Sequence, residues 1–165
     1  MEEIYFLGID PSTKSTGFAV VNQQGVLIEY GKICPDDSLH EAVTPAEKIF
    51  IQYNEISALM NKYPFTKVLC EDQFFQNNVD TLKQLSRVSG MVLLISAQYS
   101  IPVEMTYPSQ WRKIFHGNGK AKKTETLRKV NEMFGLDLKL TKHNDISDAI
   151  GIACSGAIAD TNLGE

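Results

Sequence analysis

The 165-residue sequence predicts an α/β protein in which helices cover both faces of a mixed five-stranded sheet. Short apolar runs bounded by turn residues alternate with longer segments of helical periodicity. The first three runs follow one another through short turns, whereas each of the two later runs is preceded by a helical segment. A hydrophobic content of 43% is sufficient for one domain with a substantial core, which we place at residues 1–165.

Three antiparallel strands are predicted at the N-terminus. An apolar run at residues 4–9 leads into Asp10, which we expect near the centre of the first strand, and hydroxyl-rich residues then form a tight turn. A second apolar run at 18–21 is separated from a third at 26–33 by a polar turn ending in Gly25, which can adopt a positive φ. This spacing is typical of short strands joined by hairpin turns.

The first helix is predicted to begin at Pro45 with Thr44 as its N-cap, because proline suits a first helical turn and threonine can accept a backbone hydrogen bond. Apolar residues recur at helical spacing as far as Met60, and Pro64 lies just beyond the end. The later elements are expected in this order: a strand at 67–70, a helix at 80–100, a strand at 101–107, helices at 109–115 and 124–134, and a last helix at 144–159 that packs tightly on the sheet.

Charge is distributed unevenly along the chain. The net charge is −4, yet residues 112–142 carry nine Lys or Arg and three acidic residues, whereas the rest carries seven basic and seventeen acidic residues. This asymmetry indicates a basic face for a polyanion beside an acidic surface or pocket, with a solvated basic helix as the alternative.

The sequence also bears on cellular location. It has no apolar stretch long enough to span a membrane, and its first residues do not resemble a signal peptide. The three cysteines are widely spaced and odd in number, which is typical of reduced thiols and not of disulfides or a zinc site. We therefore expect a cytoplasmic protein.

Four acidic residues are candidates for a common site. Asp10 follows the first apolar run and Glu71 the fourth, and the ends of neighbouring parallel strands meet in one crevice. Asp145 and Asp148 share one face of the last predicted helix, for which Asn144 is the expected cap. Considered alone, this pair could instead complement the helix dipole.

The acidic set favours a hard cation. Four carboxylates without histidine or cysteine suit Mg²⁺ or Mn²⁺ better than Zn²⁺. Glu71 is the expected ligand and the adjacent Asp72 is not, because alternation along a strand sends the two to opposite faces. Two such ions about 4 Å apart can activate a water and stabilise the leaving oxygen in phosphodiester hydrolysis. The sequence offers no convincing Ser-His-Asp or Cys-His set for a different chemistry.

The order of these motifs resembles that of the RuvC family of Holliday junction resolvases, which have a ribonuclease H-like fold. The segment GIDPSTKSTGFAVV around Asp10 is similar to the first motif of the family, and Glu71 begins an E-x-x-F-x-x-x-N pattern. The loop GNGKAKK resembles the family's basic loop, and Asp145 opens a closing D-x-x-D-A motif. Ser12 and Thr13 stand where many relatives carry glycine, but hydroxyl residues also suit a turn.

The resemblance implies a homodimeric DNA endonuclease that resolves four-way junctions by paired symmetric nicks, with the helix at 80–100 in the dimer interface. It implies two Mg²⁺ per active site, for which Mn²⁺ can substitute, bound by Asp10, Glu71, Asp145 and Asp148. Lys123 is implied as a further catalytic residue, and the implied DNA contacts are Phe74, Arg112, Lys113, Lys120, Lys122 and Arg128. The alternative for Phe74 is a buried core or interface aromatic. Such a divergent member would come from a bacterium or one of its phages.

Three other functions remain open at this point. A nuclease of the same fold could cut branched DNA less selectively, or could process RNA. From a different class, a phosphotransferase related to actin and the sugar kinases could use the turn after Asp10 to hold a nucleotide, although the chain is short for a second lobe. A junction-binding protein without activity is disfavoured, because a pure binder gains nothing from acids placed near phosphate.

Overall fold

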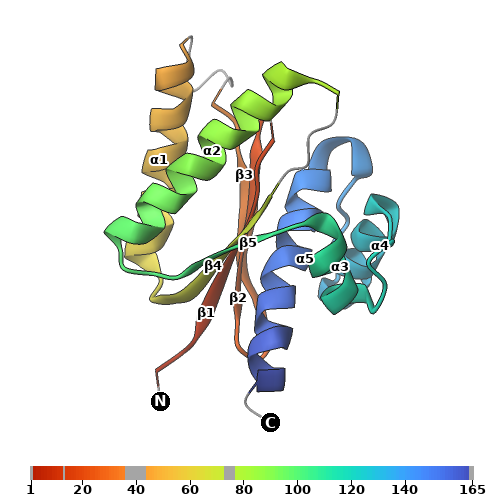
Figure 1. The fold of residues 1–165 in the computed structure, drawn as a ribbon. Helices are drawn as coiled ribbons and strands as arrows, with labels where there is room; N and C mark the ends of the chain where they lie inside the picture. Colours follow the sequence, from red (N-terminus) through yellow and green to blue (C-terminus); the bar gives the residue numbers. More distant parts are fainter. Residues whose placement is uncertain (1, 13, 36–43, 73–76, 164–165) are drawn as a thin grey trace.

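A five-stranded mixed sheet forms the centre of the computed structural model, which describes residues 2–12, 14–35, 44–72 and 77–163 (Figure 1). The strands β1 to β5 are Tyr5–Asp10, Thr16–Asn22, Leu27–Ile33, Phe65–Glu71 and Val103–Thr106. They lie in the order β3-β2-β1-β4-β5. The pairs β1–β2 and β2–β3 are antiparallel, whereas β1–β4 and β4–β5 are parallel. The predicted mixed sheet is thus confirmed.

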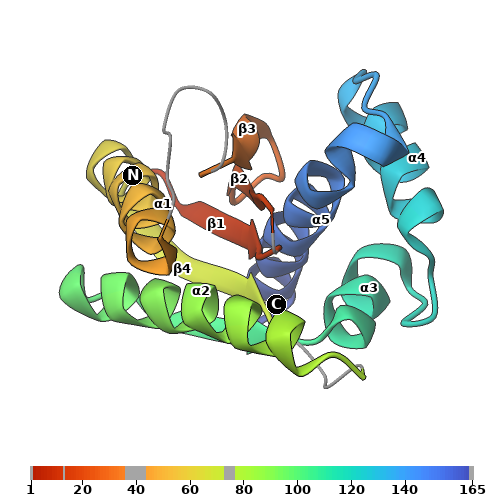
Figure 2. The ribbon, with the colours of Figure 1, turned by 90° about the horizontal axis from the view of Figure 1, so that it is seen from above.

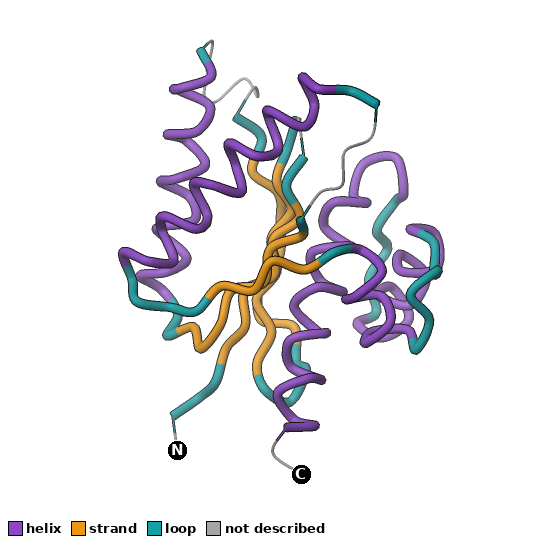
Figure 3. Tube along the Cα trace, in the orientation of Figure 1, coloured by secondary structure: helices purple, strands orange, loops and turns teal. Residues whose placement is uncertain are grey.

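Helices cover both faces of this sheet, as predicted. Helices α1 (Pro45–Lys62) and α2 (Val79–Gln98) lie on one face, and α5 (Leu140–Leu163) lies on the other (Figures 1 and 2). The shorter helices α3 (Pro108–His116) and α4 (Lys123–Phe134) pack against α5. Figure 3 shows the resulting layers of helices, strands and helices. No helix in these described ranges combines the length and apolarity that a membrane crossing requires.

Each face of the sheet has its own apolar core because strand residues alternate in direction. In β1, Leu7 belongs to the cluster under α1 and α2, whereas its neighbour Phe6 belongs to the cluster under α5. Both side chains are almost fully buried. A central sheet packed on both sides provides a rigid frame from which loops and strand ends can present functional groups.

The predicted start of α1 is confirmed in detail. The Thr44 hydroxyl oxygen accepts a hydrogen bond from the Glu47 N–H at 3.2 Å, and the Glu47 carboxylate accepts one from the Thr44 N–H at 2.8 Å. This reciprocal capping box satisfies two backbone donors that the helix itself cannot pair. Pro45 occupies the first helical position, where its missing N–H is not needed.

The start of the last helix differs from the prediction. Helix α5 begins at Leu140, so Asn144 lies inside the helix and is not its N-cap. The backbone of Lys139 stabilises the earlier start, because its N–H donates to His143 Nδ1 and its carbonyl accepts from the His143 N–H, both at 2.8 Å. Apart from the exposed Leu140, the first turn is polar, and the apolar pattern used for the prediction therefore begins only after it.

Two predictions about the acids change accordingly. Asp10 is the last residue of β1 and not a central one. Asp145 and Asp148 lie beyond the first turn of α5, where the effect of the helix dipole has largely decayed. The dipole interpretation of this pair is therefore wrong, and the two acids need another explanation.

Candidate active site

Parallel pairing of β1 and β4 brings two acids to one edge of the sheet. Ile9 is paired with Cys70, so the next residues, Asp10 and Glu71, leave neighbouring strands together. They are 4% and 7% exposed, respectively. Both line a cleft of about 290 Å³. The end of β1 at which these acids lie is remote from both chain termini (Figure 1).

Helix α5 supplies the other two acids because it lies very close to β1 and β2. A Cβ on Gly17 would come within 2.1 Å of the Asp145 carbonyl oxygen, and a Cβ on Gly8 within 2.4 Å of the Ala149 carbonyl oxygen. These two strand positions therefore require glycine. Asp145 lines the same cleft, and Asp148, nearly one turn later, is almost fully buried with 1% exposed.

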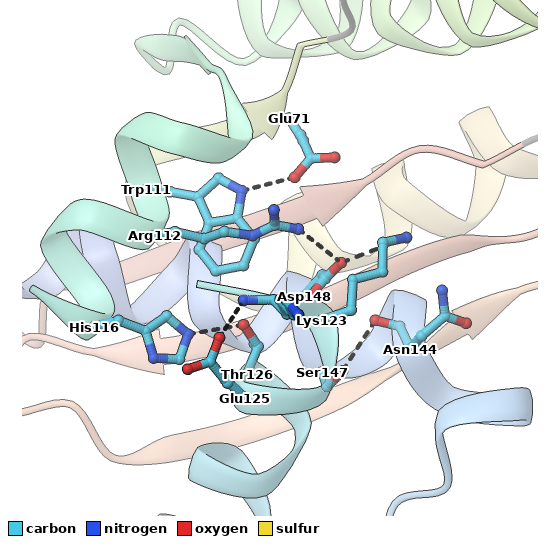
Figure 4. Close-up of polar contacts among 11 residues, drawn as sticks. Glu71, Trp111, Arg112, His116, Lys123, Glu125, Thr126, Asn144, Ser147 and Asp148 are labelled. Carbon is cyan, nitrogen blue, oxygen red and sulfur yellow. Dashed lines mark hydrogen bonds and ion pairs between the residues drawn. The ribbon is translucent and has the colours of Figure 1, made fainter. Parts of the chain in front are cut away.

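Two basic side chains approach the buried Asp148. Arg112 Nη2, from α3, and Lys123 Nζ, from the first residue of α4, lie 4.0 Å and 3.9 Å from Asp148 Oδ2 (Figure 4). Both carboxylate oxygens of Asp148 are buried without a hydrogen-bond partner among the residues described. A buried carboxylate held only by long ion pairs is costly unless another ligand completes its coordination.

The acids raise one another's proton affinity. Burial raises the pKa of Asp10 well above its ordinary value, and the charges of Glu71, Asp148 and Asp145 raise it further. Burial and the Glu71 charge raise the pKa of Asp148 to about 7, although Lys123 and Arg112 oppose this shift. The site therefore carries more negative charge than its own cations neutralise.

Two further residues hold the acids in place, and neither was assigned a role from the sequence. The indole N–H of Trp111 donates to Glu71 Oε2 at 2.7 Å, and the Ser15 hydroxyl donates to Asp145 Oδ2 at 2.8 Å. A signal existed for each, because Trp111 is the only tryptophan and Ser15 belongs to the hydroxyl-rich turn after β1. Hydrogen-bonded supports of this kind orient the groups that do the chemistry.

The donor set can be tested against a cation. No three acidic, histidine or cysteine side chains in the described ranges are gathered closely enough to enclose an ion as they stand. The chemistry nevertheless fits a hard cation, because the candidate ligands are all carboxylates and the Asp148 oxygens lack hydrogen-bond donors. A bound cation would also relieve the repulsion that raises the pKa of Asp10 and Asp148.

A family model described as "Crossover junction endodeoxyribonuclease RuvC" matches residues 6–156. The chain belongs to the RuvC family. The RuvC protein of Roseiflexus sp. is 33% identical over 153 residues, covering 89% of this chain and 86% of the relative. That of Halothermothrix orenii is 28% identical over 154 residues, covering 91% and 90%.

Solved structures confirm the ribonuclease H-like fold. The RuvC of T. thermophilus in complex with a Holliday junction substrate matches with a TM-score of 0.79 and 20% identity, covering 96% of each chain. A yeast mitochondrial Holliday junction resolvase matches with a TM-score of 0.65 and 15% identity, covering 96% of this chain and 81% of that one. Membership of the RuvC family favours a nuclease over the phosphotransferase considered from the sequence.

The residues expected to contact DNA in this RuvC-family chain fall into three groups. Arg112 and Lys123 lie beside the acids, as described above. The exposed positions on α3, on the following loop and on α4 are Lys113, Lys120, Lys122 and Arg128. Phe74 lies outside the described residues, and its implied contact with DNA stays a prediction.

Proposed function

We propose that this RuvC-family protein is a metal-dependent endonuclease that resolves four-way DNA junctions by paired symmetric nicks. The observation that carries the proposal is the convergence of four acids from β1, β4 and α5 beside two cations. The family supports the same conclusion, since its model and curated relatives are described as crossover junction endodeoxyribonucleases.

The acids would serve as the metal ligands. Asp10, Glu71, Asp145 and Asp148 are the carboxylates that would hold two Mg²⁺ ions, for which Mn²⁺ can substitute. Bound ions of this kind supply an activated water and stabilise charge on the scissile phosphate. Burial and the negative charges of neighbouring acids raise the pKa of both Asp10 and Asp148, an arrangement that is costly without ligands and useful with them.

Lys123 and Arg112 would contribute positive charge at the scissile phosphate. Lys123 Nζ lies 3.9 Å from Asp148 and its side chain is 55% exposed, so it can approach both the acid and an incoming strand. Arg112 is more buried, with 16% of its side chain exposed, and its guanidinium lies 5.1 Å from the centre of the Trp111 ring. A fixed cation on a packed helix is already oriented for an anion before the anion binds.

The direct test is a map of nicks on a fixed four-way junction whose strands are labelled one at a time. With Mg²⁺ we expect two nicks at symmetric positions in opposite strands, and with EDTA none. Equal cutting of linear duplex would overturn the proposal. Equal cutting of three-way and four-way junctions would replace it with the broader branched-DNA nuclease.

Junction binding is expected to depend on salt through the exposed lysines that precede α4. The logarithm of the association constant falls as the logarithm of the salt concentration rises, and each phosphate contact makes this slope steeper. In the double variant K120A/K122A two such contacts are lost, so the slope should be shallower by about two. Fluorescence anisotropy across a salt series measures this. K67A is the control, since Lys67 lies in β4, well before Glu71, and its side chain pairs with Glu104 at 3.2 Å. An unchanged slope in K120A/K122A would contradict the prediction.

The dimer is expected to form through an apolar stripe on the outer face of α2. Val79, Leu93 and Leu94 are 52%, 44% and 56% exposed, and a Cβ on Gly90 would meet open space. Small and apolar residues at helical spacing allow a second helix to approach closely. Two copies would supply the two active sites that paired nicks require.

The substitution L94E tests this interface. We expect a monomer by analytical ultracentrifugation, because a charge at the centre of an apolar interface is strongly unfavourable, and we expect the paired nicks to be lost. V26E is the matched control, since Val26 is 52% exposed on the turn between β2 and β3. If L94E sediments as a dimer, the α2 interface is wrong.

A further inference from the structure

A short hydrogen bond to a candidate metal ligand comes from a residue that cannot itself bind metal. The indole N–H of Trp111 donates to Glu71 Oε2 at 2.7 Å, although the two residues are 40 positions apart in the chain (Figure 4). Trp111 is fully buried and Glu71 is 7% exposed, so water does not compete with this bond. A hydrogen bond to a carboxylate in such surroundings is among the stronger ones in proteins.

The indole ring has little freedom to move. A Cβ on Gly151 of α5 would come within 2.7 Å of Trp111 Cζ3, so the ring lies directly on the helix backbone at that point. The Arg112 guanidinium also lies against the indole, 5.1 Å from the ring centre. Because the ring is fixed by packing, the N–H points toward Glu71 Oε2 in a fixed direction.

Helix α3 thereby reaches two different acids through consecutive residues. Trp111 contacts Glu71 from β4, and Arg112 lies 4.0 Å from Asp148 of α5. One short helix therefore contacts carboxylates from both β4 and α5. The ordinary explanation, that a buried tryptophan simply needs a partner for its N–H, does not explain why that partner is one of the four acids.

We infer that Trp111 is a positioning residue of the metal site, whose N–H holds the Glu71 carboxylate in the orientation in which it binds Mg²⁺ or Mn²⁺. The inference rests on the proposed function. An indole N–H is a donor only, so it supports the carboxylate without competing for the metal. Supporting residues of this kind typically affect metal affinity or activity by about 10- to 100-fold.

Substitution W111F tests the inference, because it keeps an aromatic ring and removes the donor. We expect the Mg²⁺ dissociation constant, measured by isothermal titration calorimetry below the melting temperature, to rise about 10-fold or more. The control is F115L, a comparable core lesion on the same helix, since Phe115 is 2% exposed and lies outside the acidic cluster. If Trp111 has a purely structural role, W111F and F115L should both lower stability and leave the Mg²⁺ affinity unchanged. That result would overturn the inference.

A double-mutant cycle with E71Q separates a direct effect from an indirect one. In the E71Q background, W111F should cause no further loss of Mg²⁺ affinity, because the carboxylate that it positions is already gone. Independent, multiplying losses would contradict the inference. If the wild type itself neither binds Mg²⁺ nor cuts junctions, the proposed function fails; if it does both and W111F matches it, only the role of Trp111 is overturned.

The wild-type protein offers a readout that does not depend on the folding of W111F. Since Trp111 is the only tryptophan, a ¹H–¹⁵N spectrum contains a single indole N–H signal. The proton of this indole N–H should exchange slowly with solvent. Its chemical shift should change in E71Q and much less in D145N. During a Mg²⁺ titration the chemical shift should change in the wild type but not in E71Q. An indole signal that is the same in E71Q and in the wild type would overturn the inference.

Discussion

Replacing Asp10 by asparagine is expected to reduce cleavage of a four-way junction by about 10³-fold or more while leaving junction binding unchanged. Asp10 lies at the end of β1 with 4% exposed, and asparagine has nearly the same size. The variant should therefore fold. It removes one negative charge from a site whose excess of charge suits a cation, so the loss falls on metal binding and catalysis.

Single-turnover nicking with saturating enzyme and Mg²⁺ measures the rate, and a mobility shift in Ca²⁺ or EDTA measures binding. D160N is the matched control, because Asp160 lies near the far end of α5, where it accepts a hydrogen bond from Gln23 at 3.1 Å. This control should cut at the wild-type rate. Wild-type cleavage by D10N would remove the basis of the proposed function.

Replacing Asp148 by asparagine is expected to stabilise the metal-free protein at pH 8 while abolishing cleavage. The folded protein holds a proton on Asp148 up to a pKa of about 7, whereas the unfolded chain releases it near the ordinary value of 3.8. Between these values the folded state binds more protons than the unfolded state, so this residue lowers the free energy of unfolding as the pH rises. Asparagine cannot ionise and carries no such penalty, which is on the order of a few kcal/mol.

Urea unfolding of wild type and D148N in EDTA, at pH 4.5 and at pH 8, measures the difference. The two proteins should have similar stability at pH 4.5, where Asp148 is protonated in the folded state, and D148N should be the more stable at pH 8. Addition of Mg²⁺ at pH 8 should stabilise the wild type more than D148N. A variant that is less stable than the wild type at pH 8 would contradict both the raised pKa and its assignment to Asp148.

Stability and function oppose each other at this site. The acids repel one another in the metal-free protein, and Arg112 and Lys123 offset only part of that repulsion. Substitutions that improve the metal-free fold should therefore weaken metal binding, as is common where a site stores unfavourable interactions for use with a ligand.

The sequence by itself determined the fold class and indicated which acids come together. Alternating apolar runs and helical periodicity predicted the mixed sheet, and Thr44 as N-cap followed by Pro45 placed the start of α1. These signals are local, because propensity, capping and alternation depend on residues close together in the chain. The convergence of Asp10 and Glu71 was also predictable, because parallel strands end at the same edge.

Only the tertiary structure decided how these acids are held. Ser15 reaches Asp145 across 130 positions and Trp111 reaches Glu71 across 40, and no local pattern encodes contacts of that range. The true start of α5 was hidden because its largely exposed first turn contains a single apolar residue, Leu140, which shows no periodic pattern. Residue type therefore indicated the chemistry of the site, whereas its geometry and its raised pKa values arise from burial and from neighbours that are distant in the chain.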